Sequence, residues 1–195
     1  MSAVRPPPLH FDTPRLRLFV PGPEHAERLL DYALRNREHL RRWEPRRGPE
    51  YWTLGHWRLQ LEAVRAEAER GDGYRTAIVS LEDRSGPVLG IANLSQIVRG
   101  ASQSAVLGYS VDAEHEGLGV MREALAGLVR FGFDVLGLHR VQALHRPENL
   151  RSARLLEALG FEREGLARAA LYIDGAWRDH VLTALVDPRG LPPPT

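Results

Sequence analysis

In seven short stretches of the chain, apolar residues alternate with polar or small residues, which is the two-residue period of a β-strand. The Asp174-Gly175 pair between two apolar runs predicts a β-hairpin. Turn residues at 85–87 and at Gly100 predict that the strands between residues 74 and 111 form an antiparallel meander. The predicted strands are 15–20, 74–81, 88–97, 104–111, 139–145 and two final strands that flank the Asp-Gly pair.

Four other segments carry apolar residues at the three- and four-residue spacing of an amphipathic helix. They are residues 23–40, 54–70, 120–135 and 150–159. Helices inserted among hairpin-connected strands favour an α+β fold over a parallel doubly wound sheet. We expect one domain over residues 11–186, between a loose N-terminal tail (1–10) and a proline-rich C-terminal tail (187–195).

The composition is that of an ordinary soluble domain. The chain has 195 residues, of which 43% are hydrophobic and 26% charged, enough for a full core. No stretch approaches the length of a membrane span, and the N-terminus lacks the apolar core of a signal peptide. There are no cysteines, which excludes disulfides and a thiol nucleophile. We therefore expect a cytoplasmic protein.

The charge is nearly balanced, since 26 arginines and no lysines face 25 acidic residues, for a net charge of +1. A general positive field for nucleic acid is absent, so we expect no direct nucleic-acid binding, although Arg41, Arg42, Arg46 and Arg47 could form a local patch. Genome bias and adaptation to heat are both open as reasons for the excess of arginine.

Residues 107–125 (LGYSVDAEHEGLGVMREAL) combine a strand, a turn with Gly117 and Gly119, and a helix. The start of a helix exposes backbone N–H groups without partners and carries a partial positive charge, and glycines let a ligand come close to them. The segment therefore predicts a pyrophosphate-binding turn. The alternative is a plain tight turn without a ligand.

A second motif follows about thirty residues later, in NLRSARLLEALGF (149–161). Asn149 can cap a helix and Gly160 can end it, so capping alone accounts for these two residues. The order and spacing of both motifs, however, resemble the GCN5-related N-acetyltransferases (GNAT). Segments 36–45, 90–100, 160–165 and 172–185 resemble the ribosomal-protein-alanine N-acetyltransferases of the RimJ/RimL type within that family, closest to RimJ, and the likeness covers most of residues 11–186.

The resemblance implies the GNAT acyl-CoA N-acyltransferase fold, with a mixed, mostly antiparallel seven-stranded sheet and about four flanking helices. It also implies direct transfer of acetyl from acetyl-coenzyme A, without a metal, to the N-terminal α-amine of an alanine or serine, typically on a ribosomal protein. A homodimer is a further expectation, because exposed strands of this fold often pair between subunits.

Cofactor contacts are also implied by the resemblance. Pantetheine would lie along the strand at Ser110, Val111 and Asp112, and N–H groups near Val111 would bind the thioester oxygen. Glu114 and Glu116 depart from the family, because their charges would oppose a pyrophosphate if they pointed at it. The other implied cofactor residues are Gly117, Leu118, Gly119, Val120, Met121, Arg122, Asn149, Ser152 and Arg154, with Arg151 as an alternative to Arg154.

Catalytic residues are harder to transfer from the family. Leu156 stands where many relatives carry a tyrosine acid, and Leu171 where RimL-like enzymes carry a glutamate. Ser152 matches a serine near the sulfur and is our candidate hydrogen-bond donor or acid, with a plain first-turn serine as the alternative. The candidate bases are Tyr109, His145 and Glu164, and a water chain would leave no signature.

Substrate contacts are expected from residues that folding explains least, namely Trp43, Glu44 and Asn93, beside Tyr51 and Trp52. Hydrophobic packing is the competing explanation for the tryptophans. Two other functions stay open at this point. The protein could acetylate a small amine such as an aminoglycoside, a polyamine or an amino acid, or it could be a non-catalytic acyl-coenzyme A sensor or ribosome assembly factor.

Overall fold

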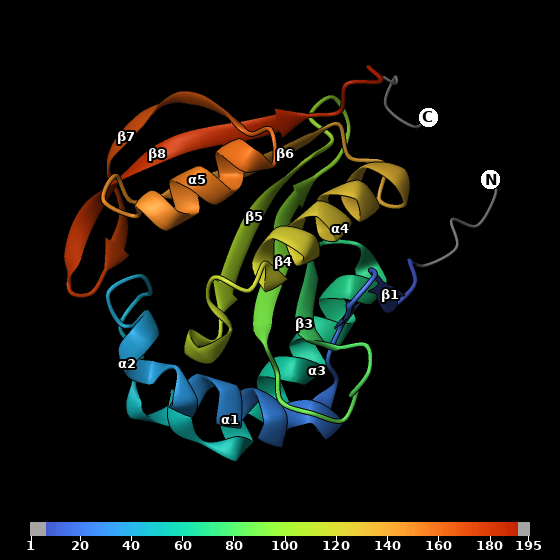
Figure 1. Cartoon of the computed structure of the whole chain (residues 1–195), viewed down its shortest axis with the longest axis vertical. Helices are drawn as coiled ribbons and strands as arrows, with labels where there is room; N and C mark the ends of the chain where they lie inside the picture. Colours follow the sequence, from blue (N-terminus) through green and yellow to red (C-terminus); the bar gives the residue numbers. More distant parts are fainter. Residues whose placement is uncertain (1–6, 191–195) are drawn as a thin grey trace.

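The strands form one mixed sheet through the whole molecule (Figure 1). The computed structural model describes residues 7–190. The strand order is β1-β2-β3-β4-β5-β6-β8-β7, and every neighbouring pair is antiparallel except β5 and β6. The strands are β1 (His10–Asp12), β2 (Leu16–Phe19), β3 (Tyr74–Ser80), β4 (Gly90–Val98), β5 (Ser104–Val111), β6 (Arg140–His145), β7 (Glu162–Ile173) and β8 (Ala176–Val186).

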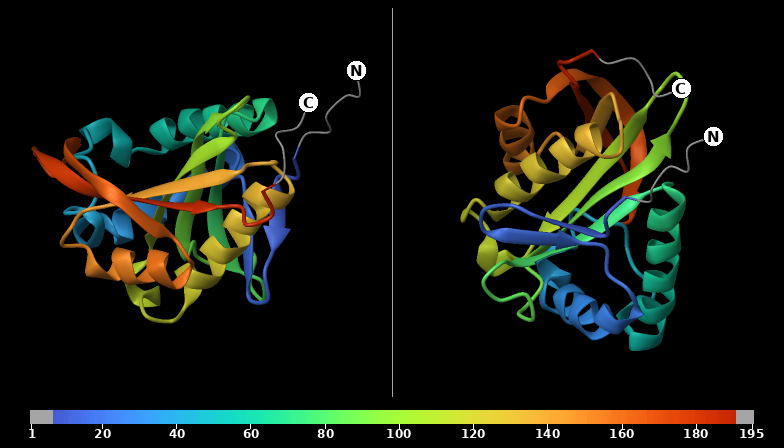
Figure 2. Two further views of the ribbon diagram at one scale, coloured as in Figure 1. Left: turned by 90° about the horizontal axis from the view of Figure 1, so that it is seen from above. Right: turned by 90° about the vertical axis from the view of Figure 1, so that its right-hand side faces the viewer.

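Helices cover both faces of this sheet. In Figure 1, α4 and α5 cross in front of the strands and α3 lies behind them, and the side view of Figure 2 separates the two layers. The helices are α1 (Ala26–Arg35), α2 (Arg37–Leu40), α3 (Leu54–Arg70), α4 (Val120–Asp134) and α5 (Leu150–Ala158), with short 3-10 turns at Pro23–His25, Pro49–Trp52 and Ala113–His115.

The apolar stripe of α4 anchors this helix to the sheet. Leu125 and Leu128 are fully buried in one cluster with Leu94 of β4 and Val141 of β6. Full burial of each such side chain contributes about 2 kcal/mol. A second cluster joins α1, α3 and β3 on the other side of the sheet, around Trp57. The sheet is therefore covered on both faces.

The α+β class and the meander are confirmed, but two details of the expectation were wrong. The sheet has eight strands rather than seven, because the three-residue β1 pairs with β2 and is too short to show a periodic pattern. The predicted helix at 23–40 is divided into a 3-10 turn, α1 and α2. The break lies at Asn36, a buried residue whose side chain bonds to Asp112 and Ala113, directly after β5.

Residues that follow β8 are bonded to α4. Arg189 donates to both carboxylate oxygens of Asp187 and to Asp134 of α4, at 2.7–3.0 Å. At the other end, the carbonyl of Pro8 accepts a hydrogen bond from Tyr74. Residues 1–6 and 191–195 of the predicted tails lie outside the described residues.

Candidate active site

The parallel strands β5 and β6 separate halfway along their length. They pair from Ser104 to Leu107 of β5, and among the described residues no pair follows, although β5 continues to Val111 and β6 to His145. On its other side β5 remains paired with β4 up to Val111. Residues 108–111 therefore present one backbone edge without a strand partner, and such an edge can pair with an extended ligand that carries amides.

The turn after β5 holds the two glycines in the backbone conformation that only glycine adopts easily. Gly117 and Gly119 both have a φ of 76°, and an added Cβ at Gly117 would meet no atom within 4 Å, so the turn is open on that side. Gly119 is the N-cap of α4 and supplies no side-chain cap. The first N–H groups of α4, from Val120 to Arg122, are left for a ligand. Arg122 is exposed beside them.

Asp112 anchors this turn rather than facing a ligand. Its N–H donates to the carbonyl of Leu89 at 2.9 Å, and its carboxylate accepts from Asn36 Nδ2 (2.9 Å), from the N–H of Glu114 (3.0 Å) and from Arg35. Burial alone would raise the pKa of Asp112, but these hydrogen bonds and the Arg35 charge hold it below its usual value. The Asp112 side chain therefore positions the turn, while the cofactor contact expected at residue 112 is one of the backbone and stays a prediction.

Tyr109 and Ser152 meet beside the gap between β5 and β6. The Tyr109 hydroxyl lies 2.5 Å from Ser152 Oγ, although 43 residues separate them. Asn149 caps α5 by accepting a hydrogen bond from the Ser152 N–H (3.1 Å), which fixes the serine in place. Burial raises the pKa of Tyr109 to about 12 even though the bond to Ser152 lowers it. A phenol with this pKa is protonated at neutral pH, so Tyr109 is able to donate a hydrogen bond and is poorly suited to the role of base considered above.

A cavity of about 480 Å³ opens on the α1 and α3 side of the same strands. Its floor includes Asn93 of β4 with Gly108, Tyr109 and Ser110 of β5, and Glu44 and Tyr51 lie on its wall. The cavity and the free edge of β5 thus meet at Tyr109. Burial raises the pKa of Glu44, against the lowering effect of Arg47, whose Nη2 lies 3.6 Å from the carboxylate.

Three of the expected residues are not among those that line this cavity. The Trp43 ring contacts instead the guanidinium groups of Arg42 and Arg146, which lie 4.5 and 5.5 Å from its centre. His145 is buried at the end of β6, where its Nδ1 contacts the carbonyl of Arg146 at 3.0 Å. Glu164 pairs with Arg140 at the opposite end of β6, about 16 Å along the strand from His145, so it is removed as a candidate base.

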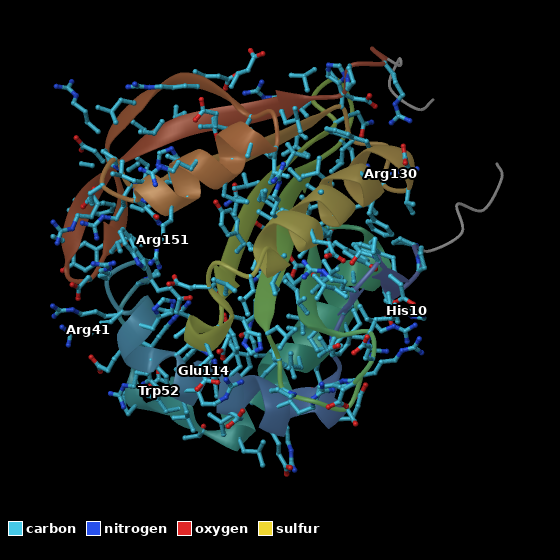
Figure 3. All side chains as sticks on the ribbon, viewed as in Figure 1. His10, Arg41, Trp52, Glu114, Arg130 and Arg151 are labelled. Atoms are coloured by element: carbon cyan, nitrogen blue, oxygen red, sulfur yellow. The ribbon has the colours of Figure 1, made fainter. Side chains whose placement is uncertain are left out.

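The two glutamates before the glycines behave differently from each other. Glu116 forms an ion pair with Arg151 at the start of α5 and lies 3.5 Å from His39 of α2. Glu114 is exposed on the turn, and Figure 3 labels it together with Arg151. Arg151 is therefore already paired, which leaves exposed Arg154 as the arginine of α5 without an acidic partner among the described residues.

Three further residues of the site carry no motif. Tyr32 of α1 bonds Ser110 Oγ at 2.9 Å, yet in the sequence it reads as part of an apolar helix stripe. Asn36 ends that helix, and a polar residue at a position of the apolar stripe is the one signal that the sequence offered for it. Gly108 lies inside a strand, where glycine is unfavourable, which is a weak signal for a ligand.

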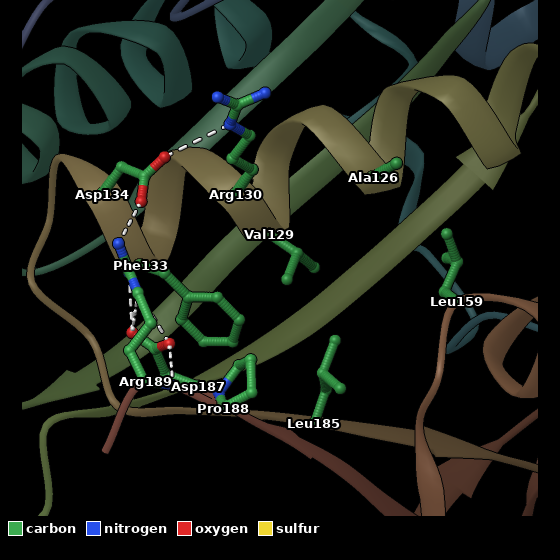
Figure 4. A pocket seen from close by; sticks show the side chains of 10 residues that line it. All are labelled: Ala126, Val129, Arg130, Phe133, Asp134, Leu159, Leu185, Asp187, Pro188 and Arg189. Carbon is green, nitrogen blue, oxygen red and sulfur yellow. Dashed lines mark hydrogen bonds and ion pairs between the residues drawn. The ribbon is translucent and has the colours of Figure 1, made fainter. Parts of the chain in front are cut away.

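A second hollow, of about 520 Å³, lies between α4 and the end of β8 (Figure 4). Its walls are the apolar side chains of Val129, Phe133, Leu159 and Leu185. The charges at its rim are paired with one another, Arg130 with Asp134 and Arg189 with Asp187. It therefore presents no free chemical group for a reaction.

Over residues 7–190, no group of three or more His, Asp or Glu side chains is arranged to hold a metal ion. No helix within this range is long and apolar enough to cross a membrane.

The fold, the free strand edge and the glycine turn agree with the comparison with known proteins. A family model described as an acetyltransferase (GNAT) domain matches residues 15–162. The chain belongs to this family and is an enzyme of the acetyltransferase class, which confirms the resemblance seen in the sequence.

Several similar proteins within the family are named as acetyltransferases of ribosomal proteins. The chain is 37% identical over 186 residues to the ribosomal protein uS5-alanine N-acetyltransferase of Escherichia coli (strain K12), with 95% of each chain covered. A ribosomal-protein-S5-alanine acetyltransferase from Vibrio fischeri superimposes with a TM-score of 0.88 at 31% identity, over 95% of this chain and 100% of that one. RimJ of Mycobacterium smegmatis, in complex with CoA-disulfide, gives a TM-score of 0.86 at 29% identity, over 96% and 91% of the two chains.

Proposed function

We propose that this enzyme transfers the acetyl group of acetyl-coenzyme A to the N-terminal α-amine of a protein that begins with alanine or serine, by direct transfer in a ternary complex. The main support is the meeting, at Tyr109, of a strand edge without a partner and a cavity of about 480 Å³. The names of the relatives point to a ribosomal protein as acceptor.

The residues present fit acetyl-coenzyme A. The edge of β5 at 108–111 can pair with the pantetheine amides, and the turn of Gly117 and Gly119 with the N-terminus of α4 suits a pyrophosphate. Arg122 and Arg154 are exposed near that path and add positive charge. When bound, the thioester supplies an activated acetyl group, and N–H groups near Val111 would stabilise the charge that forms on its oxygen.

The leaving thiolate would be stabilised by the hydroxyls of Tyr109 and Ser152. Because the pKa of Tyr109 is about 12 and that of a thiol about 8.5, full proton transfer from the phenol is unfavourable and a hydrogen bond is its useful contribution. The proton on the sulfur then comes from the attacking amine. An α-amine has a pKa of about 7.7–8.0, so roughly a tenth of it is neutral at pH 7 without any base.

Glu44 would receive the cationic acceptor, because it is one of the residues that line the cavity. His145 remains the candidate base. By the alternation along β6 it lies on the sheet face that carries Leu107 and Tyr109 of β5, opposite to the cavity face of Ser110, so it would reach the amine through the gap between β5 and β6. In this proposal the enzyme works in the cytoplasm, where ribosomal proteins are made.

The test is the release of free thiol from acetyl-coenzyme A by the pure protein. Peptides that begin with Ala or Ser are compared with spermidine, an aminoglycoside and a peptide with a blocked N-terminus. Turnover of free N-termini alone supports the proposal, and turnover of small amines alone replaces the acceptor class. Tight cofactor binding without any turnover would make the protein a sensor or assembly factor.

A homodimer is part of the proposal, because β7 is an edge strand of the sheet with Leu166 and Leu171 exposed. Light scattering on the pure protein gives the mass in solution. A monomer at micromolar concentration would contradict it.

A further inference from the structure

Asn93 and Gly108 lie directly opposite each other in the floor of the cavity. They are register partners in the antiparallel pair of β4 and β5, and both line the cavity. The next residues of β5, Tyr109 and Ser110, line it as well, so this pair lies immediately beside the place where the acetyl group would be transferred.

Nothing in the protein itself requires glycine at position 108. Its φ lies outside the left-handed region, and an added Cβ would meet no atom within 4 Å. Glycine inside a strand weakens the strand, and it commonly marks a place where a ligand comes close. By the alternation along β5 a side chain at 108 would point to the same face as Ser110, into the cavity. The missing side chain therefore leaves space on the acceptor side.

Asn93 has an unmet hydrogen-bonding capacity at the same place. Its Oδ1 is shielded from solvent and receives no hydrogen bond from the residues that the structure describes. A shielded polar atom without a partner is costly, and in native structures it calls for a ligand or another explanation. The terminal torsion of an asparagine is soft, so its amide can turn toward a ligand in the cavity. A peptide N–H is the donor that such an oxygen would take.

We propose that Asn93 and Gly108 form the subsite for the first residue of the acceptor, an inference that rests on the proposed function. The open space at Gly108 takes the side chain of that residue. Asn93 Oδ1 accepts a hydrogen bond from the first peptide N–H. Together they place the α-amine beside Tyr109.

The first test is Gly108→Ala, with Gly165→Ala as the matched control. Gly165 also lies in a strand, away from the cavity, and a Cβ there also meets no atom within 4 Å. Peptides that begin with Gly, Ala, Ser or Val are compared by kcat/KM. A misfit of one methyl group in a pocket changes kcat/KM by about 10- to 200-fold. We therefore expect Gly108→Ala to raise the ratio of Gly-peptide to Ala-peptide turnover at least tenfold, and Gly165→Ala to leave the ratio unchanged.

The second test probes the hydrogen bond. A depsipeptide with an ester oxygen in place of the first peptide N–H should be turned over about five- to tenfold less efficiently by the wild-type enzyme, and Asn93→Leu should remove this preference for the amide. Coenzyme A affinity, measured by calorimetry, reports whether each variant keeps its cofactor site.

Two results would overturn the subsite alone while leaving the proposed function intact. One is peptide acetylation with the same Gly-to-Ala ratio in Gly108→Ala as in the wild-type enzyme, and the other is an amide preference that survives in Asn93→Leu. Acetylation of spermidine and of no peptide by the wild-type protein would overturn both the subsite and the proposed acceptor.

Discussion

The bond between Tyr109 and Ser152 gives the sharpest kinetic prediction. Both hydroxyls are set beside the gap where the thiolate would leave, 2.5 Å apart. A hydrogen bond to a charged group is worth about 1.5–3 kcal/mol, and a factor of ten in rate corresponds to about 1.4 kcal/mol. We therefore expect Tyr109→Phe to lower kcat for peptide acetylation about 10- to 100-fold. KM should change little, because the charge on sulfur exists in the transition state and not in the bound substrate.

Ser152→Ala should have an effect of similar size, and the effects of the two substitutions should not add. The alanine keeps the helix cap intact, since Asn149 accepts from the backbone N–H at position 152 and not from the hydroxyl. Each hydroxyl orients the other, so removal of one also reduces the contribution of the other to stabilising the thiolate. The kcat of the double variant should be no more than about threefold lower than that of the less active single variant, which is a clear coupling in a double-mutant cycle.

The assay is thiol release under saturating acetyl-coenzyme A, with kcat and KM followed from pH 6 to pH 10. Because the pKa of Tyr109 is about 12, its ionisation lies above this range. Tyr109→Phe should therefore lower the whole profile without moving its inflections. Multiplicative losses in the double variant, a rise in KM at constant kcat, or the disappearance of a pH limb in Tyr109→Phe would each contradict the assigned role.

Three further outcomes follow from the same site. Gly119→Ala should weaken coenzyme A binding about tenfold, measured by calorimetry, because a side chain at a φ of 76° costs about 1–2 kcal/mol and relief of this strain moves the amides of the turn. An unchanged affinity would count against the turn as the pyrophosphate site. Asp112→Asn should lower the free energy of unfolding by about 2 kcal/mol at pH 7. The pKa of Asp112 is lowered in the folded state, so its contribution to stability is present above the unfolded pKa of about 3.9 and is lost as the pH falls through the folded pKa. The free energies of unfolding of the two proteins, measured in urea, should therefore converge toward pH 2. A difference between them that stays constant with pH would contradict the pairing. Glu44→Gln should raise KM for peptides about tenfold. Because burial raises the pKa of Glu44, the substitution should also remove an acidic limb of the pH profile of kcat/KM that lies above the ordinary carboxylate range. A limb that persists must belong to another group.

The fold was predictable where the signal is local. Asp174 and Gly175 turn the β7–β8 hairpin with φ values of 47° and 78°, as their types indicate, and Gly117 and Gly119 both adopt the positive φ that their turn requires. The break at Asn36 was not predictable from the helical pattern, which continues through it. Its cause is a set of bonds to Asp112 and Ala113, more than seventy residues away.

In the candidate site, the cofactor side was predictable from the sequence and most of the acceptor side was not. A cofactor held by main-chain groups needs glycines and a helix start, and these leave a trace in the sequence. The acceptor side is built from side chains on several elements whose placement depends on how far β5 and β6 separate. Glu164 illustrates the limit, since its position after the Gly-Phe pair suggested a base, whereas the register of β7 takes it to Arg140 at the far end of β6.

In the proposed function, the cofactor and the acceptor are held by different kinds of groups. The edge of β5 and the turn at Gly117 contribute mostly backbone, so substitutions elsewhere leave them intact. The cavity floor depends on single side chains, and at Gly108 on the absence of one, with no cost to packing if it were filled. A substitution there would therefore leave the stability of the fold nearly unchanged and would alter the binding of the acceptor. For this reason the identity of residue 108, set against the first residue of the acceptor, is expected to report substrate choice more directly than the glycine turn at 117–119 or the motif at 149–161.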